Sequence, residues 1–197
     1  MLMQKFYTFL DKYNDADKAN RELVKTDIWK EYGTTKATFI LDMSGFSRLV
    51  QRYGILHYLG MVRRMQVACE PIINRLSGDI VKFEADNLFA CFDKPQKAIN
   101  AAISINLAIQ AMNSMTPENE DIGVSIGIGF GEILLIEKQD FFGDAVNLGS
   151  KLGEDIAQKD EILVTENVYE LCKADFEFEK VEITVSGLQI NAFRVKY

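Results

Sequence analysis

The chain has 197 residues, of which 48% are hydrophobic and 26% charged, the usual balance of a soluble globular protein with one domain-sized core. Its net charge is −7 and its isoelectric point is about 4.9. These values argue against non-specific binding to nucleic acid or to an anionic membrane surface, because both depend on basic patches. A nucleotide ligand stays compatible with them, since bound cations can supply positive charge.

The three cysteines, at positions 69, 91 and 172, are widely spaced and have apolar neighbours, which indicates buried thiols in a reducing compartment. There is no CxxC pair and only one histidine, His57, which argues against a zinc site. No segment reaches the roughly 18 to 20 apolar residues of a membrane-spanning helix, and the charged first residues do not resemble a signal peptide. We therefore expect a cytoplasmic protein without a membrane span.

Residues 1–33 predict an amphipathic helical extension. Apolar side chains cluster around Phe6 and again around Ile28, and the polar stretch 14–17 between these clusters is suited to cap a second helix. Gly33 and two threonines end the pattern. We expect residues 34–197 to form the main domain.

Residues 37–43 (ATFILDM) form a short apolar run, which predicts a buried strand. After a Ser-Gly turn, a helical pattern extends to about Leu76. Gly54, Gly60 and Pro71 are expected to interrupt or bend this helix.

Residues 79–92 predict a β-hairpin, and Pro95 opens a predicted helix that extends to about Met112. The strand predicted over 123–137 contains glycines at 127, 129 and 131, which indicate a bend or the close approach of a ligand or a second backbone. The remaining predicted elements are a helix over 144–157, a strand over 162–164, a helix over 166–172 and two antiparallel strands at the C-terminus. This order predicts an α+β fold of the ferredoxin-like (βαββαβ) type, an antiparallel-rich sheet with helices packed on one face.

Two aspartates stand at predicted strand ends. Asp42 follows the first strand, and Asp86 lies in the turn of the hairpin. Each alone is typical of a turn or helix-cap residue. In a ferredoxin-like core the first strand and the hairpin are neighbours, so the two carboxylates would share one edge of the sheet. Such a pair is suited to bind divalent cations that polarise phosphate oxygens and lower the pKa of an attacking hydroxyl.

Three segments together resemble the class III adenylyl and guanylyl cyclases. FILDMSGFSRL is similar to the first metal motif of that family, GDIVKFEADNLFACF to the hairpin that carries the second metal ligand, and DFFGDAVNLGSKL to the strand-to-helix motif that selects the purine. The resemblance covers about residues 36–165. It implies the class III nucleotidyl cyclase fold and the conversion of a nucleoside triphosphate to a cyclic nucleotide.

By this resemblance, Asp42 and Asp86 bind two Mg²⁺ or Mn²⁺ ions, and the backbone around Gly45 and Phe46 lies near the triphosphate. Lys82 matches the lysine that hydrogen-bonds the purine ring. Without this resemblance, Asp42 and Asp86 would be interpreted as turn acids, the backbone around Gly45 and Phe46 as a turn, and Lys82 as a solvated strand lysine.

Asp140, a loop acid when taken alone, matches the residue that reads the exocyclic group of the purine. The pair favours adenine, because a lysine donates to ring N1 and a carboxylate accepts from the N6 amine. Guanine in the same position would place acceptor against acceptor and donor against donor. The resemblance and this chemistry together imply ATP as the substrate.

Asn147 matches the asparagine that orients the ribose, and Lys151 matches a position where the family usually has arginine. Lysine keeps the positive charge but lacks the planar fork that grips two phosphate oxygens. Two other departures are Ala85, where the family has glycine, and a shorter stretch over 132–139. The family also implies a head-to-tail homodimer in which Asp42 and Asp86 of one chain face the purine- and ribose-binding residues of the other.

Three alternatives stay open on the sequence. Lys151 and Ala85 would also suit a degenerate relative that binds nucleotide or dimerises without catalysis. A diguanylate cyclase would need a Gly-Gly-Asp/Glu-Glu-Phe turn, which EADNLF at 84–89 does not match. An RNA-binding ferredoxin-like domain would need a basic sheet with exposed aromatic residues, which the acidic composition disfavours.

Overall fold

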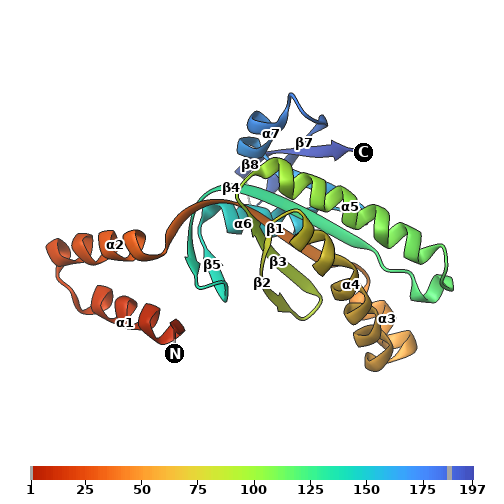
Figure 1. Ribbon diagram of the computed structural model, residues 1–197, viewed down its shortest axis with the longest axis horizontal. Coiled ribbons are helices and arrows are strands. Elements are labelled where there is room, and N and C mark those ends of the chain that lie inside the picture. Colours follow the sequence, from red (N-terminus) through yellow and green to blue (C-terminus); the bar gives the residue numbers. More distant parts are fainter. Residues whose placement is uncertain (1, 186–187) are drawn as a thin grey trace.

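A computed structural model describes residues 2–185 and 188–197 of the chain. An eight-stranded sheet forms its centre, with the order β2-β3-β1-β4-β6-β8-β7 and with β5 paired to β4 (Figure 1). The strands are β1 Gly33–Met43, β2 Asp79–Glu84, β3 Asn87–Phe92, β4 Val124–Ile136, β5 Asp140–Phe142, β6 Ile162–Thr165, β7 Glu177–Val185 and β8 Leu188–Lys196. The helices are α1 Leu2–Asp15, α2 Lys18–Tyr32, α3 Phe46–Tyr53, α4 Ile55–Arg75, α5 Pro95–Asn113, α6 Asp144–Ser150 and α7 Glu166–Cys172, with a short 3₁₀ turn, η1, over Glu118–Glu120 and a π-helical segment, η2, over Lys151–Ile156.

The sheet is antiparallel except where β4 pairs with β6. The predicted α+β fold with an antiparallel-rich sheet is confirmed. At the centre, β1 pairs with β3 on one side and with β4 on the other. The first strand and the hairpin are therefore neighbours, as the predicted metal edge requires.

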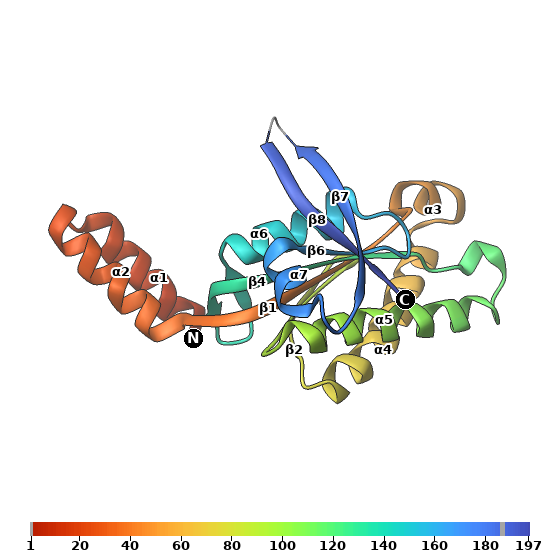
Figure 2. The same cartoon turned by 90° about the horizontal axis from the view of Figure 1, so that it is seen from above.

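The main core lies between the sheet and the helices α4, α5 and α7. Alternate residues of the central strands face it, including Phe39 and Leu41 of β1 and Ile126 and Ile128 of β4, all of which are fully buried. Helix α6 lies on the opposite side of the sheet (Figure 2). The expectation that the helices cover one face is therefore wrong for α6, the helix that carries Asn147.

Glycines allow α6 and η2 to lie directly on the strands. A Cβ atom at Gly127 would lie 2.0 Å from the carbonyl oxygen of Gly149, and one at Gly129 would lie 2.2 Å from that of Ala145. The close approach of a second backbone, predicted from the strand glycines, is confirmed. Any side chain at these two positions would push α6 away from the sheet.

Several helix and strand boundaries differ from expectation. The long helical pattern breaks at Gly54, which has a φ of +87°, but α4 continues through Gly60 and Pro71. The predicted helix over 144–157 is α-helical only to Ser150 and then continues as η2. The short strand β5 was not predicted, because three residues are too few to show a strand periodicity.

Helices α1 and α2 form a hairpin that projects beside the β4–β5 end of the sheet (Figures 1 and 2). The carboxylate of Asp17 accepts hydrogen bonds from the backbone N–H groups of Ala19 and Asn20, so the polar stretch caps α2 as predicted. Phe6 stacks on Phe142 of β5 with ring centroids 6.0 Å apart and an interplanar angle of 9°. The hairpin therefore packs on the same short strand that carries Asp140.

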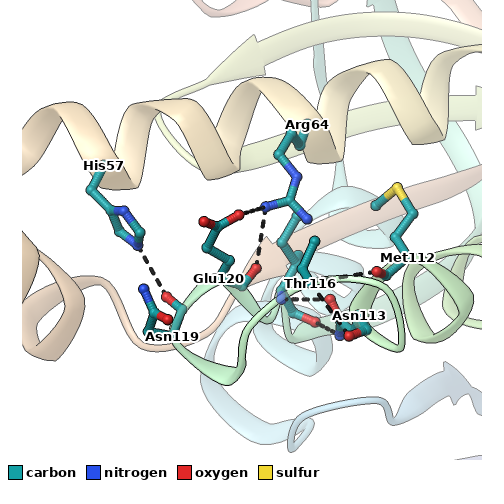
Figure 3. Close-up of polar contacts among 8 residues, drawn as sticks. His57, Arg64, Met112, Asn113, Thr116, Asn119 and Glu120 are labelled. Atoms are coloured by element: carbon teal, nitrogen blue, oxygen red, sulfur yellow. Dashed lines mark hydrogen bonds and ion pairs between the residues drawn. The ribbon is translucent and has the colours of Figure 1, made fainter.

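Polar contacts hold the segment between α5 and β4 against α4 (Figure 3). The Nε2–H of His57 donates to the backbone carbonyl of Asn119 at 3.0 Å, and Nη1 of Arg64 lies 3.0 Å from Oε2 of Glu120. These contacts fix one end of α4, the helix that presents Tyr58 to the candidate site. None of the described helices is long and apolar enough to cross a membrane.

Candidate active site

Asp42 and Asp86 lie close together at one end of the central strands. Leu41 of β1 pairs with Leu88 of β3, so Asp42, one residue further along β1, lies beside the turn that contains Asp86. Asp42 is half-buried. Burial, with the nearby charges of Asp86 and Glu154, raises the pKa of Asp42 to about 7, against a lowering by its hydrogen bond with the backbone of Met43. Two carboxylates that repel each other in this way form a site of concentrated negative charge.

Tyr58 completes this edge from the helical side. Its hydroxyl donates a hydrogen bond of 2.6 Å to Oδ2 of Asp86, and its side chain is only 2% exposed. Burial, followed by the hydrogen bond and charge of Asp86, raises the pKa of Tyr58, which keeps the phenol protonated as a donor. Tyr58 lies outside the three motifs that resemble the cyclase family. The sequence feature that could have indicated it is its place in the apolar stripe of α4, one helical turn before Met61 and Val62.

The donor chemistry of this edge fits a divalent cation. Carboxylate oxygens are the preferred ligands of Mg²⁺, and a cation would offset the burial and the charge repulsion that raise the pKa of Asp42. Across the described ranges, no cluster of three or more His, Cys, Asp or Glu side chains has the arrangement of a metal site. This edge therefore offers the carboxylates of Asp42 and Asp86 to a cation.

Lys82 and Asp140 are brought together from β2 and β5. The Nζ atom of Lys82 lies 3.2 Å from Oδ1 of Asp140 and 2.8 Å from Oε2 of Glu84. The backbone N–H of Phe141 donates to Oδ1 of Asp140 at 2.9 Å, which orients that carboxylate. Two residues that are 58 positions apart in the printed sequence thus form one donor–acceptor pair. Glu84, which was not predicted as a site residue, is also part of this group.

Asn147 and Lys151 lie on α6 and η2, on the outer side of the sheet. Asn147 is exposed, and Nζ of Lys151 is 3.4 Å from Oδ2 of Asp155 in the next helical turn. Among the residues that the structure describes, no hydrogen bond or ion pair joins Asn147 or Lys151 to the other predicted site residues. Their predicted association with Asp42 and Asp86 is not made within one chain.

The loop after Asp42 begins α3. Gly45 has a φ of +95°, which favours glycine, and Phe46 is 47% exposed with its ring packed at right angles on Tyr58, centroids 4.9 Å apart. In the hairpin turn, Ala85 has a φ of +52°, a left-handed conformation that costs a non-glycine residue about 1–2 kcal/mol. Ala85 therefore strains the turn that holds Asp86 but does not prevent it from forming.

Comparisons with known proteins agree with this geometry. Residues 30–196 match the family described as the adenylate and guanylate cyclase catalytic domain. A "Putative adenylate cyclase 3" of Rhizobium meliloti is 26% identical over 144 residues, which are 72% of this chain and 24% of that relative. The chain thus spans about a quarter of the length of that relative.

Solved structures show the same fold. An adenylate/guanylate cyclase/hydrolase from Silicibacter pomeroyi is 30% identical, with a TM-score of 0.70 over 83% of this chain and 96% of that one. An adenylyl cyclase from P. aeruginosa is 19% identical, with a TM-score of 0.70 over 84% of this chain and 96% of that one.

Proposed function

Because the chain belongs to the family of adenylate and guanylate cyclase catalytic domains, we propose that it is an adenylyl cyclase, which converts ATP to cyclic AMP and pyrophosphate. The 3′ oxygen of the ribose forms a bond to the α-phosphorus, the bond from that phosphorus to the bridging β-phosphate oxygen breaks, and pyrophosphate leaves. The proton of the 3′ hydroxyl passes to solvent. Positioning and electrostatics supply the catalysis, and no side chain is required as a general base.

The pairing of Lys82 with Asp140 carries the choice of adenine. Nζ of Lys82 lies 3.2 Å from Oδ1 of Asp140, so a donor and an acceptor stand side by side. Lys82 donates to ring N1 of adenine, and Asp140 accepts from its N6 amine. Binding of the base replaces the ion pair between the two side chains with two hydrogen bonds to the ligand.

Asp42 and Asp86 would hold two Mg²⁺ or Mn²⁺ ions, whose chemistry there is to lower the pKa of the 3′ hydroxyl and to neutralise charge on the triphosphate. The hydroxyl of Tyr58 fixes the orientation of Asp86 through its 2.6 Å hydrogen bond. The backbone that follows Asp42, through Gly45 and Phe46, lies near the triphosphate.

Asn147 orients the ribose, and Lys151 stabilises charge on the reacting phosphate. Both lie on the side of the sheet opposite the main core, and neither contacts Asp42 or Asp86 within the described part of the chain. These observations support a head-to-tail homodimer in which each site takes its metal ligands from one chain and its nucleotide-binding residues from the other.

The proposal is tested by incubating the purified protein with Mn²⁺ and either ATP or GTP, and by assaying cyclic nucleotide and pyrophosphate. We expect cyclic AMP with ATP, and none from the Asp42→Ala variant, which controls for a contaminating enzyme. If a folded protein forms no product from either nucleotide, the catalytic proposal is wrong, and the chain is instead a nucleotide-binding or dimerising module.

A further inference from the structure

The ammonium of Lys82 is shared between two carboxylates, and the proposed function uses only one of them. Glu84 lies two residues further along β2, on the same face of the strand, and approaches Nζ more closely than Asp140 does, 2.8 Å against 3.2 Å. Asp140 comes from β5. Two acceptors from two different strands therefore flank one donor.

Aromatic packing holds this group in place. Phe89 pairs with Lys82 across the β2–β3 hairpin, and its ring centroid lies 5.1 Å from Nζ. Phe89 also packs edge-on against Phe141, the neighbour of Asp140, with centroids 6.2 Å apart. Burial lowers the pKa of Lys82, but hydrogen bonds to Glu84 and Asp140 outweigh burial and raise it, so Lys82 is a cationic donor at neutral pH.

Adenine and guanine require opposite orders of lysine and carboxylate. Adenine has a donor at N6 and an acceptor at N1, so it needs the carboxylate beside position 6 and the lysine beside position 1. Guanine has an acceptor at O6 and donors at N1 and N2, so it needs the lysine beside position 6 and the carboxylate beside position 1. A lysine with one carboxylate can match only one of these two bases. A lysine between two carboxylates from different strands can match adenine with one carboxylate and guanine with the other.

We propose that Glu84 is a second base-reading residue, which admits guanine with its ring displaced by one position and so limits the selectivity for ATP over GTP. Asp140 and Lys82 read adenine, whereas Lys82 and Glu84 read guanine. The group has two carboxylates and one ammonium, and its second carboxylate can accept from the two donors of guanine. The inference rests on the proposed cyclase activity and names the substrates of that same site.

The test compares kcat/KM for ATP and GTP, with Mn²⁺, in the wild type and in Glu84→Ala and Glu84→Gln. We expect the ATP-to-GTP ratio to rise about tenfold in Glu84→Ala, mainly through loss of GTP turnover, because a hydrogen bond to a charged group is removed. Glu84→Gln, which keeps an acceptor, should shift the ratio less. The matched control is Asp79→Asn, which removes one negative charge from the same strand, where Asp79 pairs with Lys138. This control should leave the ratio unchanged.

A ratio of two substrates in one protein cancels losses of folding or dimerisation, so a smaller amount of active dimer in Glu84→Ala would not change it. An unchanged ratio in Glu84→Ala overturns the inference, as does a wild type that excludes GTP completely. If the wild type turns over neither nucleotide, the proposed function fails, and the same ratio is then measured from the Kd values of ATP and GTP by calorimetry. Absence of binding by either nucleotide also overturns the inference.

Discussion

At the scale of single residues, Tyr58 connects the helical core to the proposed metal site. It is nearly fully buried, yet its hydroxyl reaches Oδ2 of Asp86 at 2.6 Å. A hydrogen-bond donor behind a ligand fixes the ligand's orientation, and its loss typically costs about 10–100-fold in metal affinity or activity. Tyr58 is thus a positioning residue rather than a catalytic one.

The Tyr58→Phe variant should lower kcat/KM for ATP about tenfold or more. It should also change the Mn²⁺ concentration that gives half-maximal rate, because the missing donor acts on a metal ligand. Tyr169→Phe is the matched control, since the Tyr169 ring stacks on Phe193 and the described residues include no hydrogen-bond partner for its hydroxyl. An unchanged Mn²⁺ dependence in Tyr58→Phe would show that the hydroxyl contributes only to packing.

At the scale of the elements, the contact of α6 and η2 with β4 decides where Asn147 and Lys151 lie. Gly127 and Gly129 on the strand face the backbone of Gly149 and Ala145 on the helix, without any intervening side chain. The three atoms nearest to a methyl group at Gly127 would all belong to the backbone of Gly149 and Gly153, whereas one at Gly129 would also meet Oγ1 of Thr38. Overpacking of a rigid contact costs typically about 1–3 kcal/mol.

Gly127→Ala should therefore lower the free energy of unfolding by about 1–3 kcal/mol. It should also reduce activity, because α6 and η2 must move away from the sheet. Gly131→Ala is the matched control, since a Cβ atom there would lie 3.4 Å from the Cβ of Ala145, close to ordinary contact. Thermal unfolding and the cyclase assay measure the two effects. Equal stability of the two variants would contradict the claim that α6 and η2 contact β4 too closely to admit a side chain at Gly127.

At the scale of the whole molecule, the proposed site needs two chains. A head-to-tail dimer with two-fold symmetry builds two equivalent sites, each from different parts of the two subunits. In the proposed dimer, Asp42 and Asp86 of one chain form one half of a site, and Lys82, Asp140, Asn147 and Lys151 of the other chain form the second half. The helical extension 1–33 and the cyclase domain 34–197 stay our proposal for the division of the chain.

Complementation tests this arrangement directly. Asp42→Ala and Asn147→Ala should each be inactive alone, whereas an equal mixture of re-assembled chains should regain about a quarter of wild-type activity, because half of the dimers are mixed and each has one intact site of two. Co-purification with two different tags verifies the mixed dimer. A verified mixed dimer without activity would rule out shared sites.

Most of the strands and helices, and part of the candidate site, could be predicted from the sequence. Alternation and helical spacing identified most strands and helices, because burial on one face imposes those periods wherever an element is long enough. The strand glycines predicted the close backbone approach that α6 makes. The three motifs indicated Asp42, Asp86, Lys82 and Asp140 as a group, through resemblance to the cyclase family rather than through periodicity.

Only the tertiary structure decided the rest. The contact of Tyr58 with Asp86 depends on the placement of α4, and that of Lys82 with Asp140 depends on the pairing of β5 with β4, which no local pattern encodes. The three-residue strand β5 is too short for a periodic signal. The side of the sheet that α6 covers follows from its close backbone contact with Gly127 and Gly129 of β4. Sequence thus determined the elements and the chemical groups, whereas long-range pairing determined which of those groups meet.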